Sequence, residues 1–387
     1  MTNTMVARTL LEVSLILLAY IYAGYPLLVL VLSAFSTRTI RKRDITPKIT
    51  FIIAARNEER VIRAKLDNTL ALDYPRDKIE VIVASDCSAD RTDEIVREFS
   101  ARGVRLHRQS KRLGKTMAQN AAAAISQGDI LVFSDAPTIY STDALRKIVR
   151  NFADPEVGCV TGQLVYKDLR SSGVGKGCRS YWNYEKLLRT AESRLGLMLG
   201  VTGCISAVRR SCYAKLPRDL SSDFVIALEM HLLERRTVYE PDAVAIDFTN
   251  SRSGDEMQMR VRVVEQTLAA LSHYSSLLNP LKHGMFAFLM VSHKLLRYTA
   301  PIYLVAALVS ALCLTNAGPL FRDILAVQLV CYVAALAGWT ADLLGKDPGP
   351  TAYPYYFALA NTASVRGFLK FALGEDYITW EPVREPA

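Results

Sequence analysis

Three groups of polar residues in the middle of the chain each follow a short apolar run, and they are of types that bind phosphates, metal ions and hydroxyl groups. The groups are Arg56-Asn57-Glu58, Ser85-Asp86 and Ser134-Asp135. A carboxylate can hold a divalent cation through its hard oxygen atoms, or it can take a proton from a reacting hydroxyl group. If the three groups meet in space, they predict a binding site for a polar or charged ligand.

Regular elements must bring these groups together. The apolar runs have the composition of buried strands, and the segments between them have helical spacing. The expected strands are residues 49–55, 80–84, 104–107 and 130–134, and the expected helices are residues 58–70, 91–101 and 115–126. This alternation predicts right-handed crossovers and a mainly parallel α/β sheet. Ligands of such sheets bind beyond the carboxyl ends of the strands, where the polar groups stand.

Other residues with reactive side chains have ordinary alternatives. Lys115 follows Gly114, as in a phosphate-binding loop, but that pattern needs a glycine where Gln109 stands, so we reject it. Asp223 precedes a helical run, where an aspartate commonly caps the helix. The histidines at 231, 273, 283 and 293 are expected to sit singly, without a metal-ligand grouping or a catalytic role.

Charge-poor apolar stretches at residues 10–35 and 299–344 bracket the polar middle of the chain. The first exceeds the roughly 20 apolar residues that cross a bilayer. It is longer than a typical signal-peptide core and lacks a clear small-x-small cleavage site, which favours a retained anchor. The second breaks at Asn316-Ala-Gly-Pro319 and predicts two spans. Residues 353–373 predict an interfacial or re-entrant helix, because Asn361, Arg366 and Lys370 are costly in lipid.

Basic residues at positions 38, 41, 42 and 43 follow the first apolar stretch, so the positive-inside rule places the N-terminus outside and the middle of the chain in the cytosol. We therefore expect a multi-pass cell-membrane protein with about three spans. The predicted parts are residues 1–37, a transmembrane anchor; 38–282, a cytosolic domain; 283–298, an interfacial helix; 299–345, two transmembrane helices; and 346–387, the interfacial or re-entrant helix and a cytosolic tail.

Composition narrows the partners. The formal net charge is +9, but no nucleic-acid motif accompanies it, and basic residues beside apolar spans suit anionic lipid equally well. We therefore expect membrane lipids and no nucleic acid. The seven cysteines include no C-x-x-C pair, which predicts reduced thiols rather than a disulfide or zinc framework.

Several motifs occur together in a fixed order, and together they resemble family 2 glycosyltransferases. The segments are Phe51-Ile-Ile-Ala-Ala-Arg-Asn-Glu-Glu59, Val83-Ala-Ser-Asp-Cys-Ser-Ala-Asp-Arg-Thr92, Gly114-Lys-Thr-Met-Ala-Gln-Asn120, Phe133-Ser-Asp-Ala-Pro-Thr138, Gly200-Val-Thr-Gly203, Leu220-Ser-Ser-Asp-Phe224 and Tyr239-Glu-Pro-Asp-Ala243. The resemblance implies a GT-A-type, Rossmann-like fold. The membrane segments make the chain similar to the membrane-bound polysaccharide synthase subgroup.

The resemblance implies a site for a nucleotide-diphosphate sugar. Asp86 would bind the uridine, helped by the backbone near Ala55, Asn57 and Glu58, although Asp86 also suits an Asx turn after a strand. Lys115 would face the donor sugar or diphosphate, and its alternative is a solvent-exposed lysine at a helix start. Arg260 and Arg262 lie where relatives carry Q-x-x-R-W and would contact the diphosphate; a basic helix face against lipid phosphates is the alternative.

By the same resemblance, Asp135 is the first acid of a D-x-D motif that binds Mg²⁺ or Mn²⁺ together with the donor diphosphate. The sequence departs from that motif, because Pro137 replaces the second acid. Ser85 likewise stands before Asp86 where the family is often acidic. The cation would then be held through Asp135, phosphate oxygens and water.

Asp223 matches the acid of the family's T-E-D motif, with Ser222 in place of glutamate, and the resemblance makes it the catalytic base. A single base that activates the acceptor for in-line attack implies inversion at the anomeric carbon. Gly203 belongs to the motif expected near the acceptor. Trp182 would stack on an acceptor sugar, or anchor at the membrane interface instead.

These expectations describe an inverting hexosyltransferase that moves sugar from a nucleotide-diphosphate donor, most simply a UDP-sugar, to a saccharide acceptor in cell-surface polysaccharide synthesis. Export of a polymer through about three spans would need a homo-oligomer or an export partner. One alternative is a single-addition transferase acting on a glycolipid or polyprenyl-linked acceptor. Another is an inactive membrane scaffold that binds nucleotide sugars.

Overall fold

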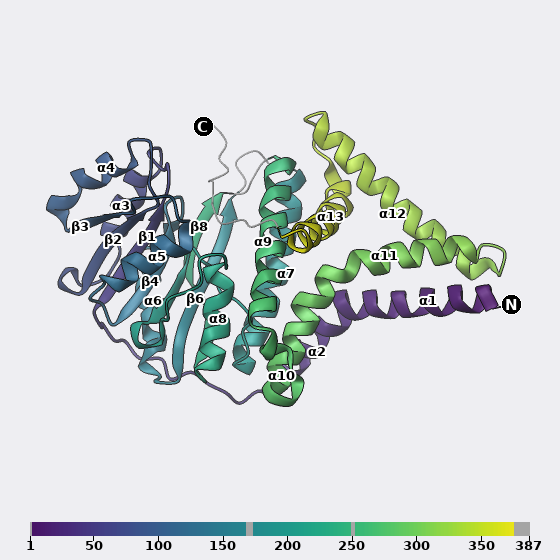
Figure 1. Ribbon diagram of the computed structural model, residues 1–387, viewed down its shortest axis with the longest axis horizontal. Coiled ribbons are helices and arrows are strands. Elements are labelled where there is room, and N and C mark those ends of the chain that lie inside the picture. The colour runs from purple at the N-terminus through teal and green to yellow at the C-terminus, as the bar shows by residue number, and fades with distance from the viewer. Residues whose placement is uncertain (1, 168–172, 249–251, 375–387) are drawn as a thin grey trace.

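The computed structural model describes residues 2–167, 173–248 and 252–374 (Figure 1). An eight-stranded sheet lies at one end of the molecule and long helices project from the other. The strand order is β3-β2-β1-β4-β7-β6-β8-β5. The strands are β1 (Ile49–Ala55), β2 (Ile79–Ser85), β3 (Val104–Arg108), β4 (Ile130–Asp135), β5 (Ile139–Tyr140), β6 (Val157–Lys167), β7 (Ser206–Arg209) and β8 (Arg236–Phe248).

The first four strands form the parallel half of the sheet, as predicted. β1 pairs in parallel with β2 and with β4, and β2 pairs in parallel with β3. Every residue of β1 is buried. Phe51 and Ile53 enter one hydrophobic core and Ile52 enters a second core on the opposite face. Continuous apolar runs are needed because both faces of a parallel sheet are covered. The α/β fold prediction is confirmed.

The other half of the sheet is mixed and was not predicted. β7 pairs antiparallel with β4 and with β6, whereas β6 pairs in parallel with the long strand β8. The register of β6 against β8 shifts between Gly162 and Gln163. A Cβ atom on Gly162 would lie 2.5 Å from the carbonyl oxygen of Ala243, so the bulge requires glycine here.

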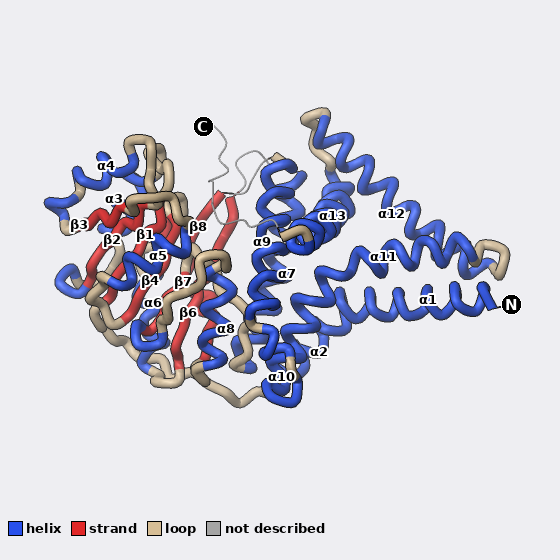
Figure 2. The backbone as a smooth tube through the Cα atoms, in the orientation of Figure 1, coloured by secondary structure: helices blue, strands red, loops and turns tan. Residues whose placement is uncertain are grey.

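Helices cover both faces of the sheet (Figure 2). The first core receives apolar side chains from α3, α4 and α6, and the second from α5, α7, α8 and the end of α9. The helices are α3 (Ile62–Leu70), α4 (Thr92–Glu98), α5 (Lys115–Ala124), α6 (Ala144–Val149), α7 (Gly173–Leu195), α8 (Ser222–Leu232) and α9 (Ser253–His273). α4 and α5 begin within one residue of their predicted starts, and α3 begins four residues after its predicted start. These three helices follow β1, β2 and β3 in the chain.

Within the described ranges, three helical runs are long and apolar enough to cross a membrane: Asn3–Ala34, Pro280–Cys313 and Pro319–Leu343. The first comprises α1 (Thr2–Ala19), a π-helical turn (Tyr20–Gly24) and α2 (Tyr25–Ala34); the second comprises α10 (Pro280–Met290), a π-helical turn (Val291–Leu295) and α11 (Leu296–Cys313); the third is α12 (Pro319–Leu343). Large apolar side chains such as Ile16, Ile302 and Val330 are exposed on them. Exposed apolar surface of this extent suits contact with lipid.

The predicted boundary between an interfacial helix at 283–298 and a span from 299 is not seen as a helix break. α10, the π-turn and α11 follow one another directly, and the non-helical backbone lies at Gly284, where φ is +50°. Glycine tolerates this conformation, so the change of direction falls near the start of the run. The predicted tail after residue 374 lies outside the described residues.

The predicted interfacial or re-entrant segment forms α13 (Ala352–Ala372), which packs against α9, α7, α11 and α12. Two glycines permit the close approach. A Cβ atom on Gly367 would lie 2.8 Å from Cβ of Val264 on α9, and one on Gly177 of α7 would lie 2.5 Å from the Tyr356 side chain. α13 therefore closes the space between the sheet domain and the apolar helices.

Membrane orientation can be tested with single cysteines in a cysteine-free background. We expect Asn316→Cys, in the exposed turn between α11 and α12, to react with an impermeant maleimide on intact cells. Asp44→Cys, in the exposed segment before β1, should react only after permeabilisation, because the basic residues before it favour the cytosol. Equal labelling after permeabilisation is the control, and the reverse pattern would overturn the orientation.

Candidate active site

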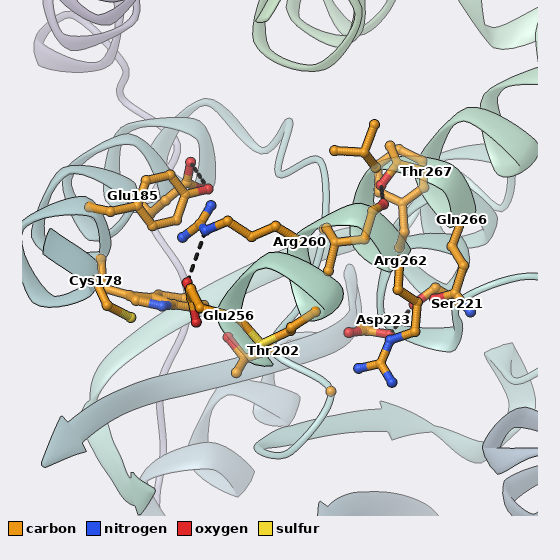
Figure 3. A pocket seen from close by; sticks show the side chains of 18 of the residues that line it. Cys178, Glu185, Thr202, Ser221, Asp223, Glu256, Arg260, Arg262, Gln266 and Thr267 are labelled. Atoms are coloured by element: carbon orange, nitrogen blue, oxygen red, sulfur yellow. Dashed lines mark hydrogen bonds and ion pairs between the residues drawn. The ribbon is translucent and has the colours of Figure 1, made fainter. Parts of the chain in front are cut away.

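A cavity of about 1660 Å³ lies at the carboxyl edge of the sheet and extends between α7, α9 and α13 (Figure 3). Seven predicted site residues line it: Lys115, Asp135, Trp182, Gly203, Asp223, Arg260 and Arg262. The first and last of them in the chain, Lys115 and Arg262, are 147 positions apart (262 minus 115). The predicted residues Ala55, Asn57, Glu58 and Asp86 are not among its lining residues.

Asp86 is buried at the end of β2, and its carboxylate is bonded to the backbone of the loop before α5. Its Oδ1 accepts a hydrogen bond from the N–H of Leu113 (2.8 Å), and its Oδ2 accepts one from the N–H of Gly114 (3.0 Å). Gly114 has a φ of +94°, which glycine adopts without strain. Asp86 thus holds the loop that presents Lys115, and a contact with the nucleotide base stays a prediction.

The loops after β1 and β2 are bonded to each other. Asn57 has a φ of +52°, its N–H donates to Ser88 Oγ (3.2 Å), and its Oδ1 accepts from the N–H of Ala89 (2.8 Å). The N–H of Glu58 donates to Thr92 Oγ1 (2.6 Å). Through these hydrogen bonds, Asn57 and Glu58 hold the loops after β1 and β2 together.

Lys115 lies between two carboxylates. Its Nζ is 2.5 Å from Oδ1 of Asp135 at the end of β4. Burial alone would lower the pKa of the ammonium group, but the charges of Asp135 and Asp223 raise it above its ordinary value. Lys115 is therefore held protonated at the edge of the sheet, where it can stabilise a negative charge on a ligand.

Asp223 is in the first turn of α8, but it is not the residue before the helix. That position is Ser221, whose Oγ donates a hydrogen bond to Oδ1 of Asp223 (2.5 Å). The backbone carbonyl of Asp223 accepts from the N–H of Val201 (2.9 Å). A Cβ atom on Gly203 would lie 3.1 Å from Oδ2 of Asp223, so glycine leaves room for the carboxylate at the cavity wall.

Two residues of α5 brace the segment that carries Asp223, and the sequence analysis missed them. Thr116 Oγ1 donates to the carbonyl oxygen of Leu220 (3.0 Å), and Asn120 bonds to the backbone of Leu216 in both directions. Both residues lie in the Gly-Lys-Thr-Met-Ala-Gln-Asn motif, which was the signal available in the sequence, and the structure shows that their polar side chains are buried. The same short helix therefore positions Lys115 and, through Leu220, Asp223.

The two predicted arginines of α9 have different surroundings. Arg260 is 2.9 Å from a carboxylate oxygen of Glu256, also bonds to the Tyr356 hydroxyl, and lies 4.3 Å from the ring centroid of Tyr181. Arg262 and Asp223 point toward one another, whereas Arg260 points to the other side of the cavity (Figure 3). Arg262 is thus near the proposed reaction centre, and Arg260 joins α9 to α7 and α13.

Trp182 lines the cavity but already packs against protein. Its ring centroid is 5.4 Å from that of Tyr166, and the Arg189 guanidinium lies 5.3 Å from its ring. The predicted sugar-stacking face is therefore partly shared with a cation. Acceptor stacking on Trp182 stays a prediction.

Asp247, near the end of β8, lines the cavity and was also missed. Its Oδ2 accepts a hydrogen bond from Thr138 Oγ1 (3.2 Å). Burial raises the pKa of this carboxyl group to about 6, and the charge of Asp135 adds to the rise. Asp247 therefore brings a second carboxylate near Asp135, although the residue two positions after Asp135 is proline.

A buried polar network joins α7 to two of the long apolar runs. Glu185 pairs with Arg297, Glu192 lies 2.6 Å from His293 Nδ1, and the Tyr25 hydroxyl donates to Glu192 (2.8 Å). Burial would raise the pKa of Glu185, but Arg297 and His293 hold it well below its ordinary value. The prediction that His293 sits singly is therefore wrong, because it contacts Glu192.

His231 also has a partner, because its Nε2 lies 3.2 Å from Nδ1 of His283. Periodicity could not reveal this pair, since the two histidines belong to separate helices. In the described ranges no three histidine, cysteine, aspartate or glutamate side chains group as a metal site. The absence of a metal-ligand grouping among the histidines stays a prediction.

Residues 50–216, which run from β1 through β7, match the family described as glycosyl transferase family 2. This segment is a glycosyl transferase family 2 domain. A mannosyltransferase from Pyrobaculum calidifontis, solved in complex with GDP-mannose and Mn²⁺, is similar in structure with a TM-score of 0.73 and 23% identity. The match covers 95% of this chain and 100% of that one, so the likeness of fold includes the long apolar helices.

Curated relatives match part of the chain. An N-acetylglucosaminyltransferase of Rhizobium sp. (strain N33) is 27% identical over 241 residues, covering 58% of this chain and 53% of the relative. A poly-beta-1,6-N-acetyl-D-glucosamine synthase of Staphylococcus aureus (strain COL) is 28% identical over 222 residues, covering 55% of this chain and 53% of the relative. The chain thus spans about half the length of these curated relatives.

The family 2 site allows a matched pair of glycine substitutions in one motif. We expect Gly203→Ala to push Asp223 aside, because the new methyl group would meet its carboxylate at 3.1 Å, and to lower glycosyl transfer between about 10- and 100-fold. Gly200→Ala is the control, since its nearest contact would be 3.7 Å. Transfer rates and melting temperatures should be compared. Equal rates for the two variants would contradict the proposed crowding of Asp223.

Proposed function

We propose that this protein is a membrane-anchored, inverting glycosyltransferase. It takes a hexose-type sugar from a nucleotide-diphosphate donor, for which we propose a UDP-sugar. It transfers this sugar to a saccharide acceptor in cell-surface polysaccharide synthesis. One observation carries the proposal: a single cavity gathers Asp223, Lys115 and Asp135 beside helices long enough to cross a membrane. The names of the curated relatives agree with a hexosamine donor.

In the proposed reaction, the acceptor hydroxyl oxygen attacks the anomeric carbon in line with the leaving group. Asp223 takes the hydroxyl proton, and the bond from the anomeric carbon to the diphosphate breaks with its electron pair remaining on the diphosphate. Lys115 stabilises the charge that develops there, because its ammonium group is held protonated. Ser221 donates to one oxygen of Asp223 and leaves the other for the acceptor.

The donor set fits a divalent cation held partly by the donor. Asp135 and Asp247 supply adjacent carboxylates at the cavity wall, which suit Mg²⁺ or Mn²⁺. A bound cation would neutralise charge on the leaving diphosphate. Asp135 is paired with Lys115, so the protein offers the cation few free ligands before the donor binds.

Calorimetry can test this dependence on the donor. Mg²⁺ or Mn²⁺ should bind weakly to the protein alone and appreciably tighter with UDP present, because phosphate oxygens complete the ligand set. Removing a residue that only supports a metal ligand typically lowers metal affinity about 10- to 100-fold. Asp135→Asn removes a direct ligand, so we expect it to weaken cation binding by more than about tenfold.

Asp129→Asn is the control for the metal experiment, because Asp129 is exposed just before β4, at the end opposite Asp135. Tight binding of the cation without nucleotide would contradict the argument. Full activity in excess chelator would show that basic residues have replaced the metal.

Asp223→Asn tests the assigned base. The substitution keeps the shape of the side chain but cannot take the proton, so transfer should fall on the order of 100- to 10,000-fold while UDP affinity stays nearly unchanged. Asp219→Asn, an exposed position in the same segment, is the control. Initial rates, calorimetry and melting temperatures should be measured together. A variant that keeps transfer but melts earlier would make Asp223 a structural residue only.

A second candidate function is single addition to a glycolipid or polyprenyl-linked acceptor. The composition of the cavity wall favours it, because the wall includes residues of two candidate membrane helices and of α13. The binding partners proposed here are a nucleotide sugar, a saccharide or lipid-linked acceptor and membrane lipids. Product length after incubation with donor separates the two functions, since a synthase extends its product and a single-addition enzyme does not.

A further inference from the structure

Lys294 carries a positive charge into the cavity from a helix long enough to cross a membrane. It belongs to the π-helical turn Val291–Leu295 within the run Pro280–Cys313, and it lines the cavity. Its Nζ lies 5.9 Å from the ring centroid of Phe224, the residue after Asp223. A lysine in an apolar span is costly in lipid and usually faces a functional cavity. A π-turn within an α-helix is also rare and frequent at functional sites.

The neighbouring cations on this side of the cavity have carboxylate partners. Arg297 pairs with Glu185, and Arg260 pairs with Glu256. Among the residues that the structure describes, no carboxylate forms an ion pair with Lys294. Its charge is felt at Glu185, where it helps to lower the pKa of that carboxyl group, but the ammonium group remains open to a ligand in the cavity.

The wall of the cavity that holds Lys294 includes residues of two candidate membrane helices and of α13. Tyr22 lies in the first apolar run and Tyr298 in the second, while Phe357 and Asn361 belong to α13. The rings of Tyr22 and Phe357 lie 5.2 Å apart, and the Tyr22 hydroxyl donates to Asn361. An aromatic wall next to lipid, with one cation inward of it, matches a molecule with an apolar tail and an anionic headgroup.

We propose that the acceptor is a sugar joined through phosphate to a lipid, and that Lys294 binds this phosphate. The inference rests on the proposed function, because Asp223 must act on a hydroxyl group of the same acceptor. Phe224 directly follows Asp223 in the chain, and its ring centroid lies 5.9 Å from Lys294 Nζ, so the sugar would place its hydroxyl at Asp223 while the phosphate reaches Lys294. The lipid tail would leave along the wall formed by Tyr22, Phe357 and Tyr298.

The step keeps the lipid phosphate intact. The acceptor sugar's hydroxyl oxygen forms the new bond to the anomeric carbon of the donor, and its proton goes to Asp223. The donor's bond to its diphosphate breaks, and the nucleoside diphosphate leaves with the electron pair. Lys294 forms a charge-assisted hydrogen bond that positions the acceptor and takes no part in bond making.

Binding to the full-length protein in detergent tests the proposal without donor. The probes are geranylgeranyl monophosphate, the uncharged alcohol geranylgeraniol and inorganic phosphate, with affinities measured by native mass spectrometry or thermophoresis. The wild-type protein should prefer the lipid phosphate over the alcohol by about tenfold, the worth of one hydrogen bond to a charged group. Lys294→Gln should abolish that preference, and Lys294→Arg should retain it.

Lys282→Gln is the matched control, because Lys282 is an exposed lysine on the same helical run and does not line the cavity. It should keep the preference. Equal wild-type affinity for lipid phosphate and alcohol would overturn the proposal whether or not the variants fold. So would an unchanged preference in Lys294→Gln, or competition by inorganic phosphate as strong as that by lipid phosphate, which would indicate a soluble anion.

UDP affinity and donor turnover separate this proposal from the one on which it rests. If Lys294→Gln weakens UDP binding and leaves the lipid preference intact, Lys294 belongs to the donor site and the acceptor proposal fails. If wild-type protein turns over no nucleotide sugar, the proposed function fails, and the lipid-phosphate measurement still reads out independently.

Discussion

Buried polar contacts at the junction between the sheet domain and the apolar helices hold this molecule in one arrangement. Arg297 and His293 lie on a run long enough to cross a membrane, and their partners Glu185 and Glu192 lie on α7 of the sheet domain. The buried charge of Glu185 is tolerated because it is paired with Arg297, and removing one partner from a buried ion pair costs about 3–5 kcal/mol. The hydroxyl of Tyr25 extends the network to the first apolar run. The cavity depends on this junction, because its walls come from both sides.

Within the sheet domain, hydrogen bonds connect the strand ends to the reactive side chains. Asp86 holds the backbone of Leu113 and Gly114, and α5 then begins with Lys115. The next residue, Thr116, donates a hydrogen bond from its hydroxyl group to the carbonyl oxygen of Leu220, which lies just before the helical turn that carries Asp223. One carboxylate at the end of β2 thus helps to position side chains on two different helices. This arrangement allows Lys115 to remain protonated close to Asp135 and Asp223.

Pro137 cannot supply a second carboxylate near Asp135, and Asp247 of β8 supplies one instead. Asp247 reaches the cavity from β8, and the interaction with Asp135 contributes to the raised pKa of its carboxyl group. Arg262 lies toward Asp223, whereas Arg260 is engaged by Glu256 and Tyr356. Charge in the cavity is therefore distributed among the ends of β4, β8 and α9 rather than concentrated in a single acidic motif.

The sequence alone determined the elements that have a strong local pattern. β1, β2 and β4 are largely apolar runs followed by polar residues, because both faces of a parallel sheet are buried, and the long apolar helices are marked by length and composition. The same motifs predicted the family and seven residues of the cavity.

Only the tertiary structure decided which side chains meet. Asp86 bonds to loop amides, His293 meets Glu192, and Asp247 approaches Asp135, in each case through partners distant in the chain. Periodicity reports the face on which a residue lies, but partner choice depends on how separate elements pack. The mixed half of the sheet and the continuity of Pro280–Cys313 were missed for the same reason.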